Sequence, residues 1–152
     1  MDNFSHPFQV TWSHMDANGH VGNVHYNALA TDARVALLLA AGYSFNASQT
    51  IGPVVLNDTI HYRKELRYGD KGKVTILLAG SSVDHAKFKI RHEIFRTGQE
   101  GDELCCVVDT FGGWMDLKER KLVCPQADYA SRFVELPKTL DYEVLSPFKP
   151  KR

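Results

Sequence analysis

The chain of 152 residues contains only three cysteines, and they show no regular spacing. Cys105, Cys106 and Cys124 are an odd number without a C-x-x-C pair, which excludes a disulfide framework and a cysteine-based zinc site. The longest apolar run, Val35 to Ala41, is far shorter than the ~20 residues of a membrane-spanning helix. The first residues also lack the basic and apolar regions of a signal peptide. We therefore expect a cytoplasmic protein that does not insert into a membrane.

The chain also lacks an excess of charge, because 18 lysines and arginines balance 18 aspartates and glutamates. Without net charge there is no overall attraction to nucleic acid, so we expect no such partner. Neither G-x-x-x-x-G-K nor G-x-G-x-x-G occurs, so a nucleotide fold has no support. Asp16-x-Asn18 resembles the start of a calcium loop, but Val21 stands where that loop requires glycine. We expect no metal site.

What the sequence does contain is one helix followed by a series of strands. Apolar residues recur every three or four positions from Tyr26 to Ala40, with Asn23 as the expected N-cap and Gly42 just past the helix end. Alternation and β-rich composition predict strands at 8–12, 54–62, 74–79, 85–95 and 104–116, the last with a bulge or bend at Gly112-Gly113. A short helix is expected near 127–135, and residues 136–152 are predicted to form an extended tail.

Consecutive strands with a separate helix define an α+β fold and not a doubly wound one. One antiparallel sheet wrapped around one long apolar helix fits this order best, and residues 1–152 make a single domain. Such a sheet has exposed edges, which usually pair with a second subunit. We therefore predict a homodimer or homotetramer with the sheets joined edge to edge.

The chemically informative segment is residues 16–26. It places the carboxylate of Asp16 in a glycine-containing loop that leads into the N-terminus of the predicted helix. Free backbone N–H groups there carry partial positive charge and polarise a carbonyl oxygen, while a carboxylate opposite acts as a general base or nucleophile. Acyl transfer requires these two parts. The alternative is that Asp16 only caps the turn through its side chain.

The motif D-x-x-G-H-V-x-N-x-x-Y, followed by Asp32-x-Arg34, resembles the 4-hydroxybenzoyl-CoA thioesterase-like group of hotdog-fold acyl thioesterases. Tyr68-Gly69-Asp70 resembles the family's strand opening, and the resemblance extends from Phe8 to Val123. It implies a hotdog fold and hydrolysis of an acyl-CoA or acyl-carrier-protein thioester. Coenzyme A is then part of the substrate, and no separate cofactor is expected.

The resemblance also assigns site residues. Asp16 matches the catalytic acidic residue, and Asn23 matches the position whose backbone N–H polarises the thioester carbonyl. Tyr26 matches a pocket-lining aromatic residue, and His20 matches a loop-shaping histidine at the substrate site. His14 stands where many relatives have a further acidic residue.

Three further assignments depend on position. His61 ends a predicted strand and is expected to border the substrate pocket. The basic run that includes Lys64 and Arg67 either binds the phosphates of coenzyme A or forms a solvated face. His92 lies on the apolar face of its strand, where a core histidine is expected.

Two other functions stay open. A hydratase of the same fold would carry a D-x-N-P-x-H motif, but Gly19 replaces the proline and His20 falls one residue early. A hotdog dimer that binds an acyl group or a partner protein without catalysis is also compatible with the sequence, because fold does not dictate function.

Overall fold

The computed structural model describes residues 4–125 and 128–148. Its elements are, in chain order, β1 (Ser5–Gln9), the 3-10 helix η1 (Trp12–His14), α1 (Asn23–Ala40), β2 (Ile51–Tyr62), β3 (Lys71–Ser82), β4 (Lys87–Gly98), β5 (Gly101–Asp116), β6 (Lys121–Leu122), α2 (Asp128–Val134) and β7 (Lys138–Leu145). Within these residues seven strands form one sheet, ordered β1-β3-β4-β5-β2, with β6 paired to β5 and β7 to β3. The β3–β7 pair is parallel and the other pairs are antiparallel.

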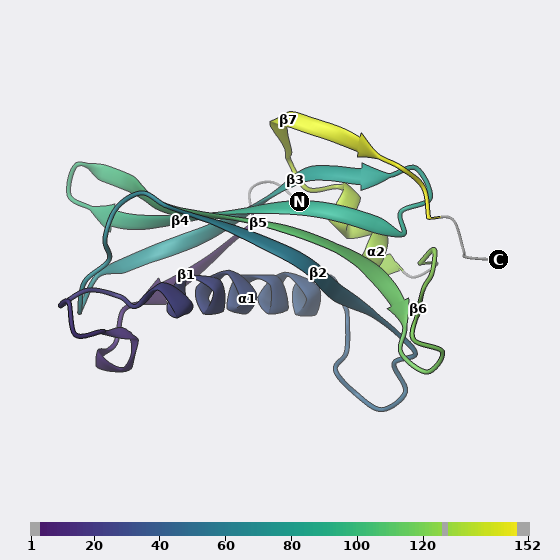
Figure 1. Cartoon of the computed structure of the whole chain (residues 1–152), viewed down its shortest axis with the longest axis horizontal. Helices are drawn as coiled ribbons and strands as arrows, with labels where there is room; N and C mark the ends of the chain where they lie inside the picture. Colours follow the sequence, from purple (N-terminus) through teal and green to yellow (C-terminus); the bar gives the residue numbers. More distant parts are fainter. Residues whose placement is uncertain (1–3, 126–127, 149–152) are drawn as a thin grey trace.

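Helix α1 lies along the inner face of the curved sheet (Figure 1). Five of the predicted apolar positions, together with Leu38, form its buried side: Tyr26, Leu29, Ala30, Ala33 and Leu37. The predicted position Ala40 is exposed. Gly42 follows the helix in the left-handed conformation (φ +89°), as predicted for a C-terminal glycine. The predicted N-cap was wrong by one position, because Gly22 is the N-cap and Asn23 is the first helical residue.

The strands confirm the predicted inner face of the sheet. The alternate residues of β4 and the turn before it are buried against α1, namely Ala86, Phe88, Ile90, His92 and Ile94. Strand β5 is continuous through Gly112-Gly113, and the register shift lies on its partner β2, between Val55 and Asn57. Both glycines are needed for close packing, since a Cβ on Gly112 would lie 2.6 Å from the carbonyl oxygen of Val54.

Both ends of the chain differ from prediction. Strand β1 ends at Gln9, and the predicted strand residue Trp12 instead begins the turn η1. The predicted tail contains strand β7, which pairs with β3 beyond the stretch of β3 that β1 occupies. Its backbone satisfies N–H and C=O groups that this part of the β3 edge would otherwise leave unpaired. Within the predicted extended tail, residues 138–145 therefore form a strand of the sheet.

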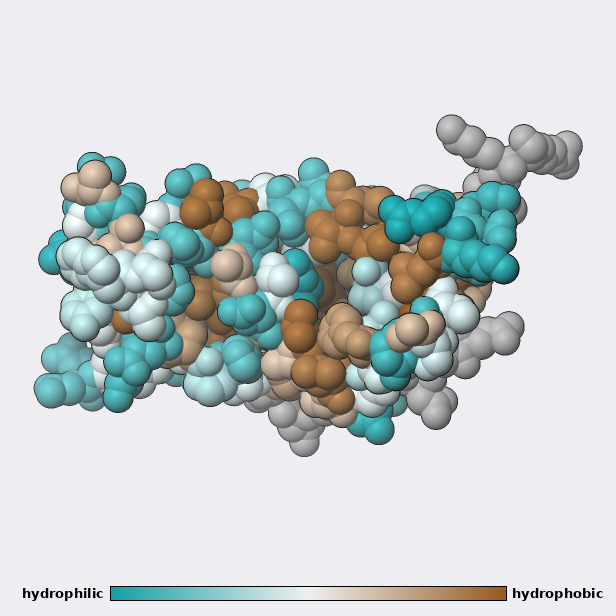
Figure 2. Space-filling view, turned by 90° about the horizontal axis from the view of Figure 1, so that it is seen from below, coloured by the Kyte–Doolittle hydropathy of each residue, from teal (hydrophilic) through white to brown (hydrophobic). Residues whose placement is uncertain are grey.

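A curled antiparallel sheet around one long helix is the hotdog α+β fold, as the sequence predicts. No helix or strand of the described residues covers the side of α1 away from the sheet, and apolar side chains gather around a hollow on this face (Figure 2). Strand β2 ends the sheet, and no other strand of the described chain pairs with its outer edge. Exposed apolar side chains lie on β2 and in the loop before it, namely Phe45, Val55 and Leu56.

Candidate active site

Asp16 lies at the surface, in the loop between η1 and α1. The loop is closed by a bridge between Met15 and Val21 and by the Asp16 N–H, which donates to the carbonyl of His20 over 3.0 Å. Oδ1 of Asp16 accepts the N–H of Asn18 over 2.8 Å, so the side chain does form a turn-capping bond. Oδ2 has no hydrogen-bond partner among the described residues. This oxygen is available for chemistry while the first oxygen orients the carboxylate.

The N-terminus of α1 has no side-chain cap. Gly22 precedes the helix and provides no side-chain oxygen. The backbone N–H groups of Asn23 and Val24 donate to no acceptor within the described chain. Such groups carry partial positive charge and are available to a ligand oxygen. Tyr62 of β2 donates its OH to the carbonyl of Asn23 over 3.2 Å, which holds the strand against the helix start.

A pocket of about 520 Å³ lies between this loop, the start of α1 and the end of β2. Five of the residues expected from the sequence line it: Asp16, His20, Asn23, Tyr26 and Lys64. Tyr26 forms a buried wall, where its OH accepts the N–H of Leu66 over 3.2 Å and its ring meets Tyr62 edge-on. Burial raises the pKa of Tyr26. The other lining residues are Asn18, Val21, Tyr62, Arg63 and Glu65.

Two predicted site residues lie outside this pocket. His61 precedes Tyr62 on β2, and adjacent strand residues point to opposite faces. Because Tyr62 reaches the helix, His61 points away from it and does not line this pocket, so its part in substrate binding stays a prediction. Arg67 pairs with Glu65 over 3.4 Å at the surface and does not line the pocket. Lys64 does line it, exposed and 4.0 Å from a carboxylate oxygen of Glu103.

Sequence reasoning missed a polar network that joins α1 to the sheet. Arg34 donates to the hydroxyl of Thr110 over 2.8 Å, and this hydroxyl donates to Asp58 over 2.6 Å. Asn27 donates to the other oxygen of Asp58 over 3.2 Å. Burial lowers the pKa of Arg34, while the nearby Asp58 raises it. The available signal was the position of Asn27 and Arg34, seven apart and therefore on one side of the helix.

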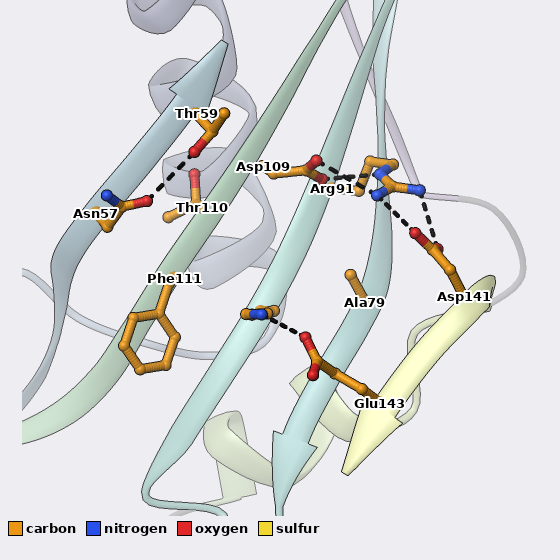
Figure 3. Close-up of a pocket in the computed structure, with 10 residues that line it drawn as sticks. Asn57, Thr59, Ala79, Arg91, Asp109, Thr110, Phe111, Asp141 and Glu143 are labelled. Atoms are coloured by element: carbon orange, nitrogen blue, oxygen red, sulfur yellow. Dashed lines mark hydrogen bonds and ion pairs between the residues drawn. The ribbon is translucent and has the colours of Figure 1, made fainter. Parts of the chain in front are cut away.

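A second concavity lies on the outer face of the sheet and contains none of the predicted residues (Figure 3). Its volume is about 310 Å³. Arg91 of β4 donates to Asp109 over 2.7 Å and to Asp141 of β7 over 3.0 Å, and Lys89 pairs with Glu143. Each cation is thus already paired with a carboxylate. These contacts reach across β3 and hold β7 to the sheet, which gives this region a structural role.

The described part of the chain shows no feature that would hold a metal ion or cross a membrane as a helix. No three His, Cys, Asp or Glu side chains there come together in a way that could hold a metal ion. No helix within residues 4–125 and 128–148 is long and apolar enough to cross a membrane.

Fold and site together define a hotdog protein with a carboxylate beside the open N-terminus of its central helix. The family model of the thioesterase-like superfamily matches residues 10–144. This range covers most of the sheet, all of α1 and the Asp16 loop. The chain belongs to the thioesterase-like superfamily. No curated protein matches it significantly.

Solved structures share the fold at low sequence identity. Protein SAV2348 from Staphylococcus aureus, solved in complex with CoA, has a TM-score of 0.79 and 17% identity, covering 96% of each chain. Slr0204, a 1,4-dihydroxy-2-naphthoyl-CoA thioesterase from Synechocystis, has a TM-score of 0.74 and 18% identity, covering 87% of this chain and 95% of its own. A mutant 4-hydroxybenzoyl CoA thioesterase complexed with 4-hydroxybenzoyl CoA has a TM-score of 0.75 and 16% identity, covering 86% and 98%. At these identities the likeness shows the fold alone.

Proposed function

We propose that the chain hydrolyses acyl-CoA thioesters, with Asp16 as general base or nucleophile and the start of α1 as the group that polarises the carbonyl. The observation that carries this proposal is the shared pocket, which Asp16 and the uncapped first turn of α1 both line. Membership in the thioesterase-like superfamily supports the reaction class. The CoA-bound structures of similar fold support coenzyme A as the thiol part of the substrate.

The reaction follows from two groups on opposite sides of the thioester. The carbonyl oxygen accepts hydrogen bonds from the N–H groups of Asn23 and Val24, which makes the carbonyl carbon more electrophilic. As general base, Asp16 takes a proton from a water molecule whose oxygen attacks that carbon. The oxyanion stays bound at the helix start until the C–S bond breaks and the thiolate leaves, taking up the proton. As nucleophile, Asp16 would form an anhydride with loss of the thiolate, and water would then hydrolyse it.

The mouth of the pocket fits the polar part of coenzyme A through exposed basic side chains. Arg63 and Lys64 line the mouth, and their charges are balanced by Asp16 and Glu65. Phosphate binding is therefore assigned to Lys64 and Arg63, and not to Arg67, which is paired at the surface. An acyl-carrier-protein thioester presents the same reacting group and is the alternative substrate.

Hydrolysis of a panel of acyl-CoAs, followed by detection of the free thiol, tests the proposal. Asp16→Asn keeps the size of the side chain and removes the basic charge, so kcat should fall by at least ~100-fold while the fold survives. Asn23→Ala should cost much less, because the backbone donor is retained. Asp116→Asn is the matched control, since Asp116 also caps a turn through its carboxylate, at the β5–β6 hairpin.

Two results would contradict the proposal. A folded Asp16→Asn protein that hydrolyses acyl-CoA within about threefold of the parent would show that the bond to Asn18 is the whole role of Asp16. A parent that binds acyl-CoA in calorimetry without releasing thiol would favour the non-catalytic acyl-binding alternative.

A further inference from the structure

The turn before Asp16 is closed by a histidine that accepts a hydrogen bond. The backbone N–H of Thr11, the N-cap of η1, donates to Nδ1 of His14 over 3.0 Å. In the usual capping box this acceptor is the side-chain oxygen of Glu or Gln. An imidazole nitrogen accepts a bond only while it carries no proton, and a protonated histidine has N–H donors at both ring nitrogens. The turn therefore requires neutral His14, with its proton on Nε2.

His14 also forms the base of the loop that carries Asp16. Its carbonyl oxygen accepts the N–H of Gly22, the N-cap of α1, over 2.9 Å. The next contact along the loop is the Met15–Val21 bridge, and after it the N–H of Asp16 donates across the loop to the carbonyl of His20. These three backbone contacts fix the carboxylate relative to the helix start, and the first of them is made by the carbonyl of His14.

The titratable groups around the His14 ring come from two elements. From α1, the ring of His25 lies 5.3 Å from it between centroids, tilted by 55°. From the loop, Asp16 lies near the backbone of His14: a Cβ on Gly22 would lie 3.6 Å from the Cβ of Asp16, 3.5 Å from the His25 ring and 3.8 Å from the carbonyl oxygen of His14. The hydroxyl of Thr11 lies 3.4 Å from Nδ1. A proton on His14 thus removes the acceptor of the turn and adds a cation beside His25.

We propose that His14 is a positioning residue for Asp16, and that its protonation releases the η1 turn and switches off the site in acid. The inference rests on the function proposed above. We expect activity to fall on acidification, because a protonated ring no longer accepts the N–H of Thr11. Asp16 performs the chemistry, and His14 acts through the geometry of the loop.

The test is the pH profile of kcat/KM between about pH 5 and about pH 8 for the parent and two variants. His14→Asn keeps a side-chain acceptor that cannot gain a proton, and His14→Ala removes the acceptor. We expect the parent to lose activity towards the acid end and His14→Asn to give a flat profile with near-parental activity at neutral pH. His14→Ala should be about tenfold less active at every pH, because its turn lacks the cap throughout. His85→Asn, an exposed histidine in the β3–β4 turn, is the matched control and should retain the parental profile.

Trp12 provides a readout that does not depend on catalysis. It is the first residue of η1, 75% exposed and edge-on to Tyr68 at 5.8 Å, so its fluorescence should change when the turn opens. Trp12→Phe should remove the signal, because the other tryptophan, Trp114, is buried. We expect a fluorescence transition over the same pH range in the parent and none in His14→Asn.

The outcomes separate this inference from the proposed function. If His14→Asn retains the acid loss of activity and the fluorescence transition of the parent, the inference is overturned while hydrolysis stands. If the parent hydrolyses no thioester, the proposed function fails and fluorescence alone decides. In that case a transition abolished by His14→Asn supports the acid-sensitive turn, and a transition that persists in this variant overturns it.

Discussion

His92 makes the stability of the fold depend on pH by an amount that follows from its burial. The side chain is fully buried on β4, with Nδ1 2.9 Å from the carbonyl of Val108 and no partner for Nε2 among the described residues. The pKa of His92 is lowered from 6.5 to about 4 by two effects: its burial, which is the larger, and the nearby charge of Arg34. The neutral ring is therefore the form that the native state accommodates.

The sign and size of the effect follow from proton linkage. Between pH 6.5 and about 4 the unfolded chain carries a proton on this histidine and the native state does not. The free energy of unfolding therefore falls as the pH falls through this window, and the contribution of His92 is fully present only above it. At about 1.36 kcal/mol per pKa unit, the loss amounts to about 3 kcal/mol. This is a large share of the about 5–15 kcal/mol that stabilises a typical domain.

Urea denaturation of the parent and of His92→Leu at several pH values measures this contribution. Leucine cannot titrate, so contributions from other groups cancel when the two proteins are compared. Leucine also leaves the carbonyl of Val108 without its ring donor, so the variant should start less stable at about pH 7. We expect the difference between the two free energies of unfolding to change by about 3 kcal/mol towards about pH 4, in favour of the variant. Two free energies that fall in parallel would refute the reasoning.

The free edge of β2, the ion pairs of β7 and the pocket mouth each give a further prediction. Light scattering should return a dimer or tetramer, and a single 17.1 kDa species at micromolar concentration would contradict edge-to-edge pairing. Arg91→Met removes the bonds to Asp109 and Asp141, so the free energy of unfolding in urea should fall by about 1–2 kcal/mol, a value reduced to allow for the partial exposure of Arg91. An unchanged free energy of unfolding would show that these bonds do not hold β7 to the sheet. Lys64→Ala should raise KM for acyl-CoA with little change in kcat. Arg67→Ala, the matched control outside the pocket, should leave KM unchanged, and equal effects of the two substitutions would contradict the assignment of phosphate binding to Lys64.

The main elements of the fold could be predicted because their signals are local. The spacing of Leu29, Ala33 and Leu37 gives the helix and its buried side, and the alternation of Phe88, Ile90 and Ile94 gives the inner face of β4. These patterns depend on residues a few positions apart, which share a face in any context. Strand β7 was missed although Leu140, Tyr142 and Val144 alternate with polar residues. This alternation does not mark a core face, since Leu140 and Val144 are exposed and only Thr139 of the strand is buried. It pairs with β3 because β1 leaves that part of the β3 edge unpaired.

The candidate site shows the same division. Asp16, His20, Asn23 and Tyr26 line one pocket, because they lie in one short loop and in the first turn of the helix that follows it. Their roles in catalysis and binding stay predictions. His61 does not line this pocket, because adjacent residues of a strand point to opposite faces and the sequence does not reveal which of the two faces packs on the helix.

The sequence by itself determined the element order, the buried side of α1 and the loop that brings a carboxylate to the start of that helix. All three depend on contiguous residues, whose relative positions the backbone fixes. Only the tertiary structure decided that Tyr62 faces the pocket, that Thr110 meets Arg34 from 76 positions away, and that the chain end completes the sheet. These contacts join distant segments, and strand pairing and helix packing set their register only when the chain has folded.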